Sequence, residues 1–177
     1  MEGQLKPITE HISSTPECQF QPLTAEDEPL IWRMLQCAAH ETTPEAVQQP
    51  VLARYATGWG RAGDMGVKAL AADEAMGAAW LRLWHGHNRG FGYVADAIPE
   101  LAIAVLPQYQ GRGIGTALLE HLLYTARAEF KAVSLNVRAD NPAVRLYERM
   151  GFRSVPGSEI INRTGGLSFN MICHLRR

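Results

Sequence analysis

Apolar residues follow two different patterns in the middle of the chain. Residues 101–106 form an almost purely apolar run stopped by Pro107, which is typical of a strand buried on both faces of a sheet. Over 114–130, apolar residues recur three or four positions apart, which predicts a helix with one buried face. A polar turn with three alternating glycines separates the two. We expect the rest of the chain to be organised around this strand, turn and helix.

Further strands and helices are predicted on both sides of this unit. Short apolar or alternating runs predict strands at 19–23, 66–72, 76–84, 132–137, 152–155 and 167–175. Helical spacing predicts one helix capped by Thr24, a second at 45–55 that kinks or restarts at Pro50, and a third capped by Asn141. Residues 73–75 are expected to form a tight hairpin turn. Because a helix connects them, strands 101–106 and 132–137 should run parallel.

Composition is typical of one globular domain. The chain has 177 residues, of which 46% are hydrophobic, enough to form a real core. Residues 1–18 lack periodicity and are expected to be a tail in front of a single domain at 19–177. A net charge of −1 provides no excess of positive charge for binding nucleic acid or an anionic membrane. Three scattered cysteines and the absence of a long apolar run favour a cytoplasmic location.

The glycine-rich turn itself predicts a site for an anion. Gly111, Gly113 and Gly115 lie directly before a helix, where free backbone N–H groups and the helix dipole attract a phosphate. The P-loop spacing is absent, because no Lys-Ser or Lys-Thr follows the glycines. The dinucleotide pattern fails at Thr116, which stands where the third glycine belongs, although Asp140 could mimic a ribose-binding acid.

Two segments together resemble a known family. The turn has the form Q-x-x-G-x-G at Gln110, Gly113 and Gly115, and the segment NPAVRLYERMGF follows at 141–152. With both segments the chain resembles the GNAT superfamily of acyl-CoA-dependent N-acetyltransferases. The resemblance implies an α/β fold with a mixed, mainly antiparallel central sheet flanked by helices. It also implies that residues 19–177 are a single N-acetyltransferase domain with acetyl-CoA as its co-substrate.

The resemblance also implies which residues hold acetyl-CoA. In the family, the central-strand backbone pairs with the pantetheine arm, which assigns Ile103, Ala104 and Val105 to that contact. The pyrophosphate loop corresponds to Gln110, Gly111, Arg112, Gly113, Ile114, Gly115 and Thr116. A solvated loop position explains Arg112 about as well. Asn141 matches a pantetheine contact, although helix capping explains it better, and the two roles are compatible.

Tyr147 is the candidate proton donor. A thiolate that leaves a thioester needs a proton, and a thiol has a pKa of about 8.5. A tyrosine, with a reference pKa of about 10, is still protonated at neutral pH and can supply it. The matching tyrosine of the family is a general acid, which implies the same role here. The alternative is a core residue packed beside Val144.

The acceptor amine must in turn lose a proton. Glu100 is the first candidate base, because it shares a strand face with two small alanines that leave room for a substrate. The alternative is a strand-end carboxylate that meets only solvent. In the ribosomal-protein acetyltransferases a glutamate serves as base at the position of Asn136, which cannot accept a proton. Glu41 and Glu45 could attract a cationic amine, and their helix-start positions explain them at least as well.

These expectations describe an acyltransferase without a metal. It would transfer acetyl from acetyl-CoA to a primary amine of a small molecule or peptide, by direct attack on the thioester. One alternative is a non-catalytic CoA-binding sensor or regulatory module, and another is a nicotinamide-dinucleotide protein. Edge strands and the tail also allow a homodimer.

Overall fold

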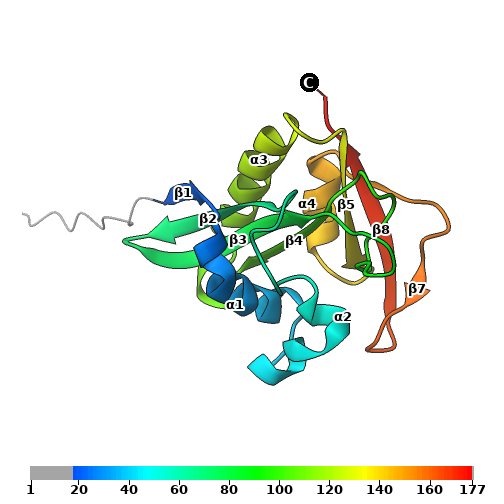
Figure 1. Cartoon of the computed structure of the whole chain (residues 1–177), viewed down its shortest axis with the longest axis horizontal. Helices are drawn as coiled ribbons and strands as arrows, with labels where there is room; N and C mark the ends of the chain where they lie inside the picture. Colours follow the sequence, from blue (N-terminus) through cyan, green and yellow to red (C-terminus); the bar gives the residue numbers. More distant parts are fainter. Residues whose placement is uncertain (1–17, 177) are drawn as a thin grey trace, which may run out of the picture.

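The computed structural model describes residues 18–176 and shows an eight-stranded sheet with helices on both faces (Figure 1). The strands are β1 (Gln19–Pro22), β2 (Met65–Ala71), β3 (Glu74–Arg82), β4 (Glu100–Val105), β5 (Ala132–Arg138), β6 (Arg153–Ser154), β7 (Ile160–Ile161) and β8 (Leu167–His174). The α-helices are α1 (Glu28–Ala38), α2 (Pro50–Ala53), α3 (Ile114–Ala126) and α4 (Ala143–Arg149). Three 3-10 turns are η1 (Ala25–Asp27), η2 (Pro44–Gln48) and η3 (Pro107–Tyr109). Within the described residues, no helix is long and apolar enough to cross a bilayer.

The sheet is mixed and mainly antiparallel, as predicted. Its strand order is β1-β2-β3-β4-β5-β8-β6, and β7 pairs with β8. Only β4 and β5 pair in parallel, with α3 as the crossover between them, while the other recorded pairs are antiparallel. The strand and helix at the centre of the sequence pattern therefore lie at the centre of the fold.

Two local details differ from the pattern-based expectation, and one agrees with it. The β2–β3 turn lies at Ala72 and Asp73, which both have positive φ, so that Glu74 already belongs to β3. The predicted restart at Pro50 is confirmed, because η2 ends at Gln48 and α2 begins at Pro50. The two-residue strand β7 was not predicted, because so short an element leaves no periodic signal.

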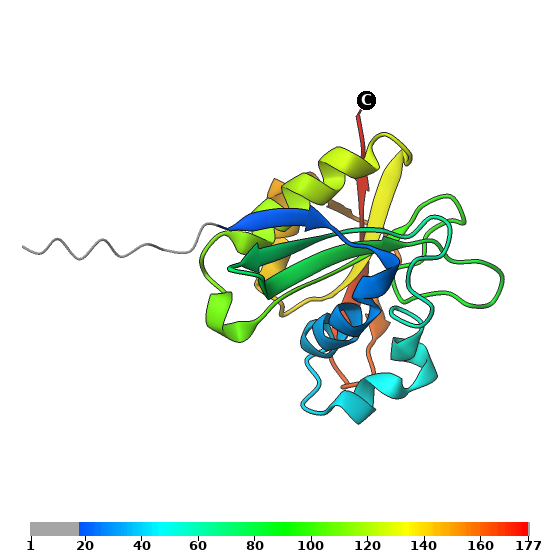
Figure 2. The same ribbon diagram turned by 60° about the vertical axis from the view of Figure 1, so that its left-hand side comes forward.

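Two apolar cores lie on opposite faces of the sheet. Figure 2 shows α3 on one face and α1 on the other. Along β3, side chains alternate between the cores: Leu81 joins the α3 side, whereas Trp80 joins the α1 side. The buried stripe of α3 is Leu118, Leu119, Leu122, Leu123 and Ala126. The helical and strand periods of the sequence thus explain which residues the fold buries.

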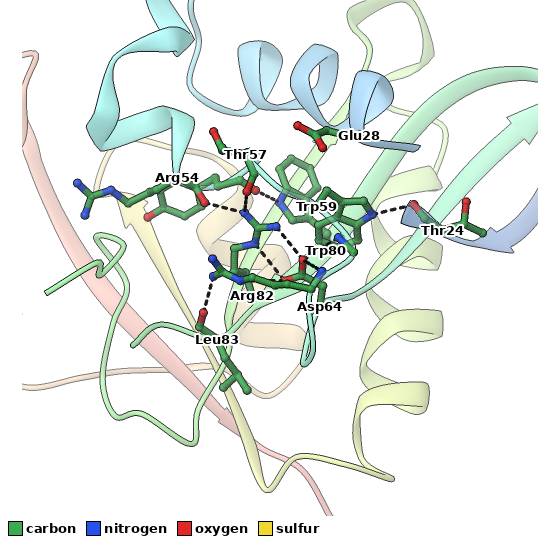
Figure 3. Close-up of polar contacts among 12 residues, drawn as sticks. Thr24, Glu28, Arg54, Thr57, Trp59, Asp64, Trp80, Arg82 and Leu83 are labelled. Carbon is green, nitrogen blue, oxygen red and sulfur yellow. Dashed lines mark hydrogen bonds and ion pairs between the residues drawn. The ribbon is translucent and has the colours of Figure 1, made fainter. Parts of the chain in front are cut away.

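A buried ion pair fastens the segment after α2 to β3 (Figure 3). The guanidinium of Arg82 is 1% exposed and donates to both carboxylate oxygens of Asp64, at 3.0 and 2.7 Å. It also donates to the carbonyls of Arg54 and Thr57, each at 2.8 Å, and stacks over the ring of Trp59. Four of the five N–H donors of this buried cation point at acceptors, so the segment 54–64 is held against the sheet.

Removing the anion of this pair should destabilise the whole fold. In Asp64→Asn the Arg82 guanidinium would stay buried without its counter-charge, which costs about 3–5 kcal/mol. We expect the midpoint of urea unfolding to fall accordingly. Asp140→Asn, which disrupts the solvent-exposed pair with Arg138, is the control and should leave the midpoint unchanged. Equal midpoints for Asp64→Asn and the wild type would show that the buried pair contributes little.

Candidate active site

The two central strands separate soon after they meet. The β4–β5 pairing is recorded at one position, Glu100 with Ser134, where the Ser134 N–H also donates to the Pro99 carbonyl at 3.0 Å. Beyond that point no further pair joins the two strands in the described chain. Ile103 and Val105 are consequently half-buried rather than fully enclosed, which corrects the prediction of a strand buried on both faces. From there the two strands separate toward their carboxyl ends, and the edge of β4 that faces β5 has no strand partner beyond Glu100 among residues 18–176. This separation is the β4–β5 gap.

The glycine-rich turn follows directly at the end of β4. The side-chain amide of Gln110 donates to the Val105 carbonyl at 2.9 Å and so ties the turn to the strand. Gly111 and Gly113 have φ of +74° and +79°, and a Cβ added at either position would meet no atom within 4 Å. Glycine is needed there for the backbone conformation, and the space above the backbone is open.

The backbone of this turn presents free donors. No described residue accepts from the N–H groups of residues 111–116, because the first intrahelical bond of α3 runs from Ala117 to the Gly113 carbonyl. These donors lie at the positive end of a 13-residue helix. The side chain of Arg112 is exposed, with its guanidinium 5.6 Å from the centre of the Tyr109 ring. This geometry is compatible with the phosphate site that the sequence predicts.

Tyr147 lies in α4, on the same side of the sheet as α3. Asn141 caps this helix, because its side-chain oxygen accepts from the Ala143 N–H at 2.9 Å. The ring of Tyr147 is buried, and its centre lies 5.9 Å from that of Phe152 in an edge-to-face arrangement. Burial raises the pKa of Tyr147 to about 12. No hydrogen bond joins its hydroxyl to another described residue, so a protonated hydroxyl is free to donate to a ligand.

Glu100 is enclosed by hydrogen-bond donors. Its side chain is 3% exposed and accepts from the Tyr55 hydroxyl at 2.7 Å, the Trp84 indole N–H at 2.7 Å and the Gly92 N–H at 2.8 Å. Burial raises the pKa of Glu100 to about 7, against the opposing effect of these donors. Alternation placed Glu100 on the correct strand face, but the expected room for a substrate beside it is absent.

The donors around Glu100 also fix the point where β4 and β5 meet. The Tyr55 hydroxyl accepts from the Phe91 N–H at 2.7 Å, and the Ser134 hydroxyl donates to the Gly92 carbonyl at 2.7 Å. Packing there is tight, because a Cβ added to Gly92 would lie 2.8 Å from the Glu100 carboxyl carbon. Sequence analysis missed this network. The signal available was the pair of glycines at 90 and 92 in an otherwise polar loop.

Comparison with known proteins identifies the family. The profile of the acetyltransferase (GNAT) family matches residues 31–152. This chain belongs to the GNAT family. An N-alpha-acetyltransferase of Sulfurisphaera tokodaii is 45% identical over 58 residues, which cover 31% of this chain and 35% of that protein. The chain spans little more than a third of the length of the curated relatives it matches first.

Solved structures of GNAT proteins share the fold. The ribosomal-protein-S18-alanine N-acetyltransferase of Escherichia coli matches with a TM-score of 0.65 and 21% identity, over 91% of this chain and 96% of that one. A Salmonella typhimurium protein whose structure contains its cofactor acetyl-CoA matches with a TM-score of 0.65 and 17% identity, over 90% and 95% of the two chains. The glycine-rich turn of this GNAT chain follows the fourth strand of a mixed sheet, which differs from a dinucleotide site that opens a parallel sheet.

The sequence links three further positions to the acceptor side, namely Glu41, Glu45 and Asn136. Glu41 forms an ion pair with Arg163, so its carboxylate is already engaged, contrary to the expectation that it would be free for a cationic amine. Glu45 is exposed. The amide of Asn136 donates to the side-chain oxygen of Asn170 at 2.9 Å. Glu41 and Asn136 of the GNAT chain are therefore already engaged, whereas Glu45 remains an exposed carboxylate on η2.

The burial of Glu100 predicts a pH dependence of stability. Its pKa is about 7 in the folded chain against a reference of 4.5, so folded protein retains a proton that unfolded protein has lost between these values. The free energy of unfolding should therefore fall by roughly 3 kcal/mol as the pH rises from 4.5 to 7. Glu100→Gln should lack this decline, as measured by urea unfolding across the range.

The matched control for this measurement is Glu120→Gln on the exposed side of α3. It should reproduce the wild-type decline. Parallel pH curves for Glu100→Gln and the wild type would mean that the three donors keep Glu100 ionised throughout the range.

Proposed function

We propose that this chain transfers the acetyl group of acetyl-CoA directly to an amine. The carrying observation is that the β4–β5 gap opens beside the glycine-rich turn, while Tyr147 follows β5 on α4. A thioester of CoA requires three things of its site: strand backbone that can pair with the extended arm, a site for the phosphates and a proton donor for the departing thiolate. The co-substrate supplies an acyl group activated as a thioester.

The strand and the turn of the chain hold the two ends of the co-substrate in this proposal. Backbone groups of Ile103, Ala104 and Val105 pair with the pantetheine arm in the place that β5 leaves free. The pyrophosphate lies against the turn, where the contacts come from Gln110, Gly111, Arg112, Gly113, Ile114, Gly115 and Thr116. Gln110 acts through the turn, since its amide is bound to the Val105 carbonyl. Asn141 fixes the start of α4 and can contact the arm from there.

Tyr147 provides the proton for the departing thiolate. Burial holds its pKa at about 12, so the hydroxyl stays protonated at neutral pH, whereas a thiol has a pKa of about 8.5. We propose direct attack by the amine, because the three cysteines lie outside β4, the glycine-rich turn and α4: Cys18 precedes β1, Cys37 lies on α1 and Cys173 lies on β8. The acceptor class is a primary amine of a peptide or small molecule, in line with relatives named N-alpha-acetyltransferase.

Calorimetric titration with acetyl-CoA tests the phosphate site. Gly113→Val would place a side chain in the open space above the turn and should abolish micromolar binding. Gly157→Val is the matched control, because Gly157 has φ of +74° and equally open surroundings. Both substitutions strain the backbone alike, so loss of binding in the first alone identifies the site. Undiminished binding to Gly113→Val would refute the proposed contact.

Tyr147→Phe tests the proton donor. Removing the hydroxyl should lower kcat roughly 10²-fold or more, while the Kd for acetyl-CoA should stay within about twofold. Release of free thiol measures the rate, and calorimetry measures the Kd. If both proteins turn over equally, Tyr147 is not the acid. If the wild type binds acetyl-CoA but acetylates no amine, the sensor alternative is favoured.

A further inference from the structure

His40 stands at a position that usually requires glycine. It follows the last turn of α1 with φ of +56°, in the left-handed region. The helix end closes around it, because the Glu41 N–H donates to the Gln36 carbonyl at 3.0 Å and the His40 N–H donates to the Cys37 carbonyl at 3.1 Å. A residue with a side chain has a higher backbone energy than glycine in this conformation, so a histidine at this position suggests a functional role.

Both neighbours of His40 are anchored to a distant turn. Arg163, between β7 and β8, donates to the Ala39 carbonyl at 3.0 Å and forms an ion pair with Glu41. The backbone on each side of His40 is thereby fixed to the far side of the fold. The imidazole itself remains exposed.

His40 lines a surface pocket at the end of β5. The other lining residues are Arg138, Asp140, Asn141 and Pro142. Asn141 caps α4, the helix that carries Tyr147. The pocket therefore lies at the carboxyl end of β5, toward which the β4–β5 gap opens, and beside the start of the helix that holds the proposed proton donor.

The acceptor side of this site needs a proton acceptor. An alkyl amine is almost entirely protonated at pH 7 and cannot attack a thioester in that form. Glu100 is enclosed by three donors, the carboxylate of Glu41 is paired, and Asn136 carries an amide. Glu45 is exposed on η2 and does not line the pocket at the end of β5. An imidazole exchanges protons near neutral pH, and His40 presents one at the open end of the gap.

We infer that His40 takes the proton from the acceptor ammonium, directly or through one water. This role rests on the acetyl transfer proposed above. An N–H bond of the ammonium breaks, and the proton passes to the imidazole. The neutral amine attacks the thioester carbon, and the carbon–sulfur bond breaks. Tyr147 gives its proton to the sulfur and regains one from the new amide nitrogen. His40 then releases its proton to solvent, so each turnover yields one free proton.

Charged groups of both signs lie in the pocket with His40 and in the adjacent backbone segment. Asp140, in the pocket, stabilises an imidazolium, whereas Arg138 opposes it and is itself paired with Asp140 at 3.1 Å. Glu41 and Arg163 neutralise each other beside it.

The test compares His40→Gln and His40→Gly with the wild type. Glycine suits the left-handed backbone, so the second variant removes the imidazole while relieving strain. His87→Gln, in the exposed loop before β4, is the matched control. The probe is a synthetic peptide with a free N-terminal alanine, whose α-amine has a pKa of about 8. The rate of thiol release gives kcat/KM from pH 6 to 9.5.

Both His40 variants should lose roughly 30-fold in kcat/KM at pH 6.5, because only the small neutral fraction of the α-amine can then react, and they should approach the wild type above pH 9, where the amine is neutral on its own. Their Kd for acetyl-CoA should equal that of the wild type. A purely structural role would lower the rate equally at every pH, and that result would overturn the inference. So would wild-type profiles in both variants. If the wild type itself binds acetyl-CoA and releases no thiol with the peptide, the proposed acetyl transfer to this amine class fails instead.

Discussion

The structure depends on the single point at which β4 and β5 meet. Glu100 and Ser134 pair there, and the carboxylate of Glu100 gathers donors from Tyr55, Trp84 and Gly92. Burying a carboxylate is costly unless its oxygens are hydrogen-bonded, so the three donors make this arrangement stable. With the strands joined at one end only, the remainder of β4 can separate from β5. The gap proposed to receive the pantetheine arm is a consequence of that geometry.

The two faces of the sheet carry different groups beside this gap. On one face, α3 and α4 supply the free N–H groups of the glycine-rich turn and the hydroxyl of Tyr147. On the other face, the connections after α1 and α2 are fixed by buried or long-range polar contacts, namely the Arg82–Asp64 pair and the contacts of Arg163. The connection after α1, which Arg163 holds in this way, can present His40 at the open end of the gap with little freedom to lose on binding.

Burial has opposite consequences for the two titratable residues that the sequence singled out. It raises the pKa of both Tyr147 and Glu100. For Tyr147, which has no hydrogen-bond partner among the described residues, the result is a hydroxyl that stays protonated and can donate. For Glu100, the surrounding donors occupy the carboxylate and remove it from contact with an acceptor. The same physical effect thus favours a catalytic role for one residue and a structural role for the other.

Local pattern was sufficient to predict the central strand, the glycine-rich turn, the helix behind it and the position of Tyr147, because each depends on residues close together in the chain. It also placed Glu100 on the correct strand face, since alternation is a local property. Only the tertiary structure decided its surroundings, because Tyr55 lies 45 residues away in sequence. The surroundings of His40 could not be predicted either. Arg163 donates to the carbonyl of Ala39, next to His40, and lies 124 residues away from it in sequence. Contacts across such separations are fixed by how the elements pack, and no short stretch of sequence records them.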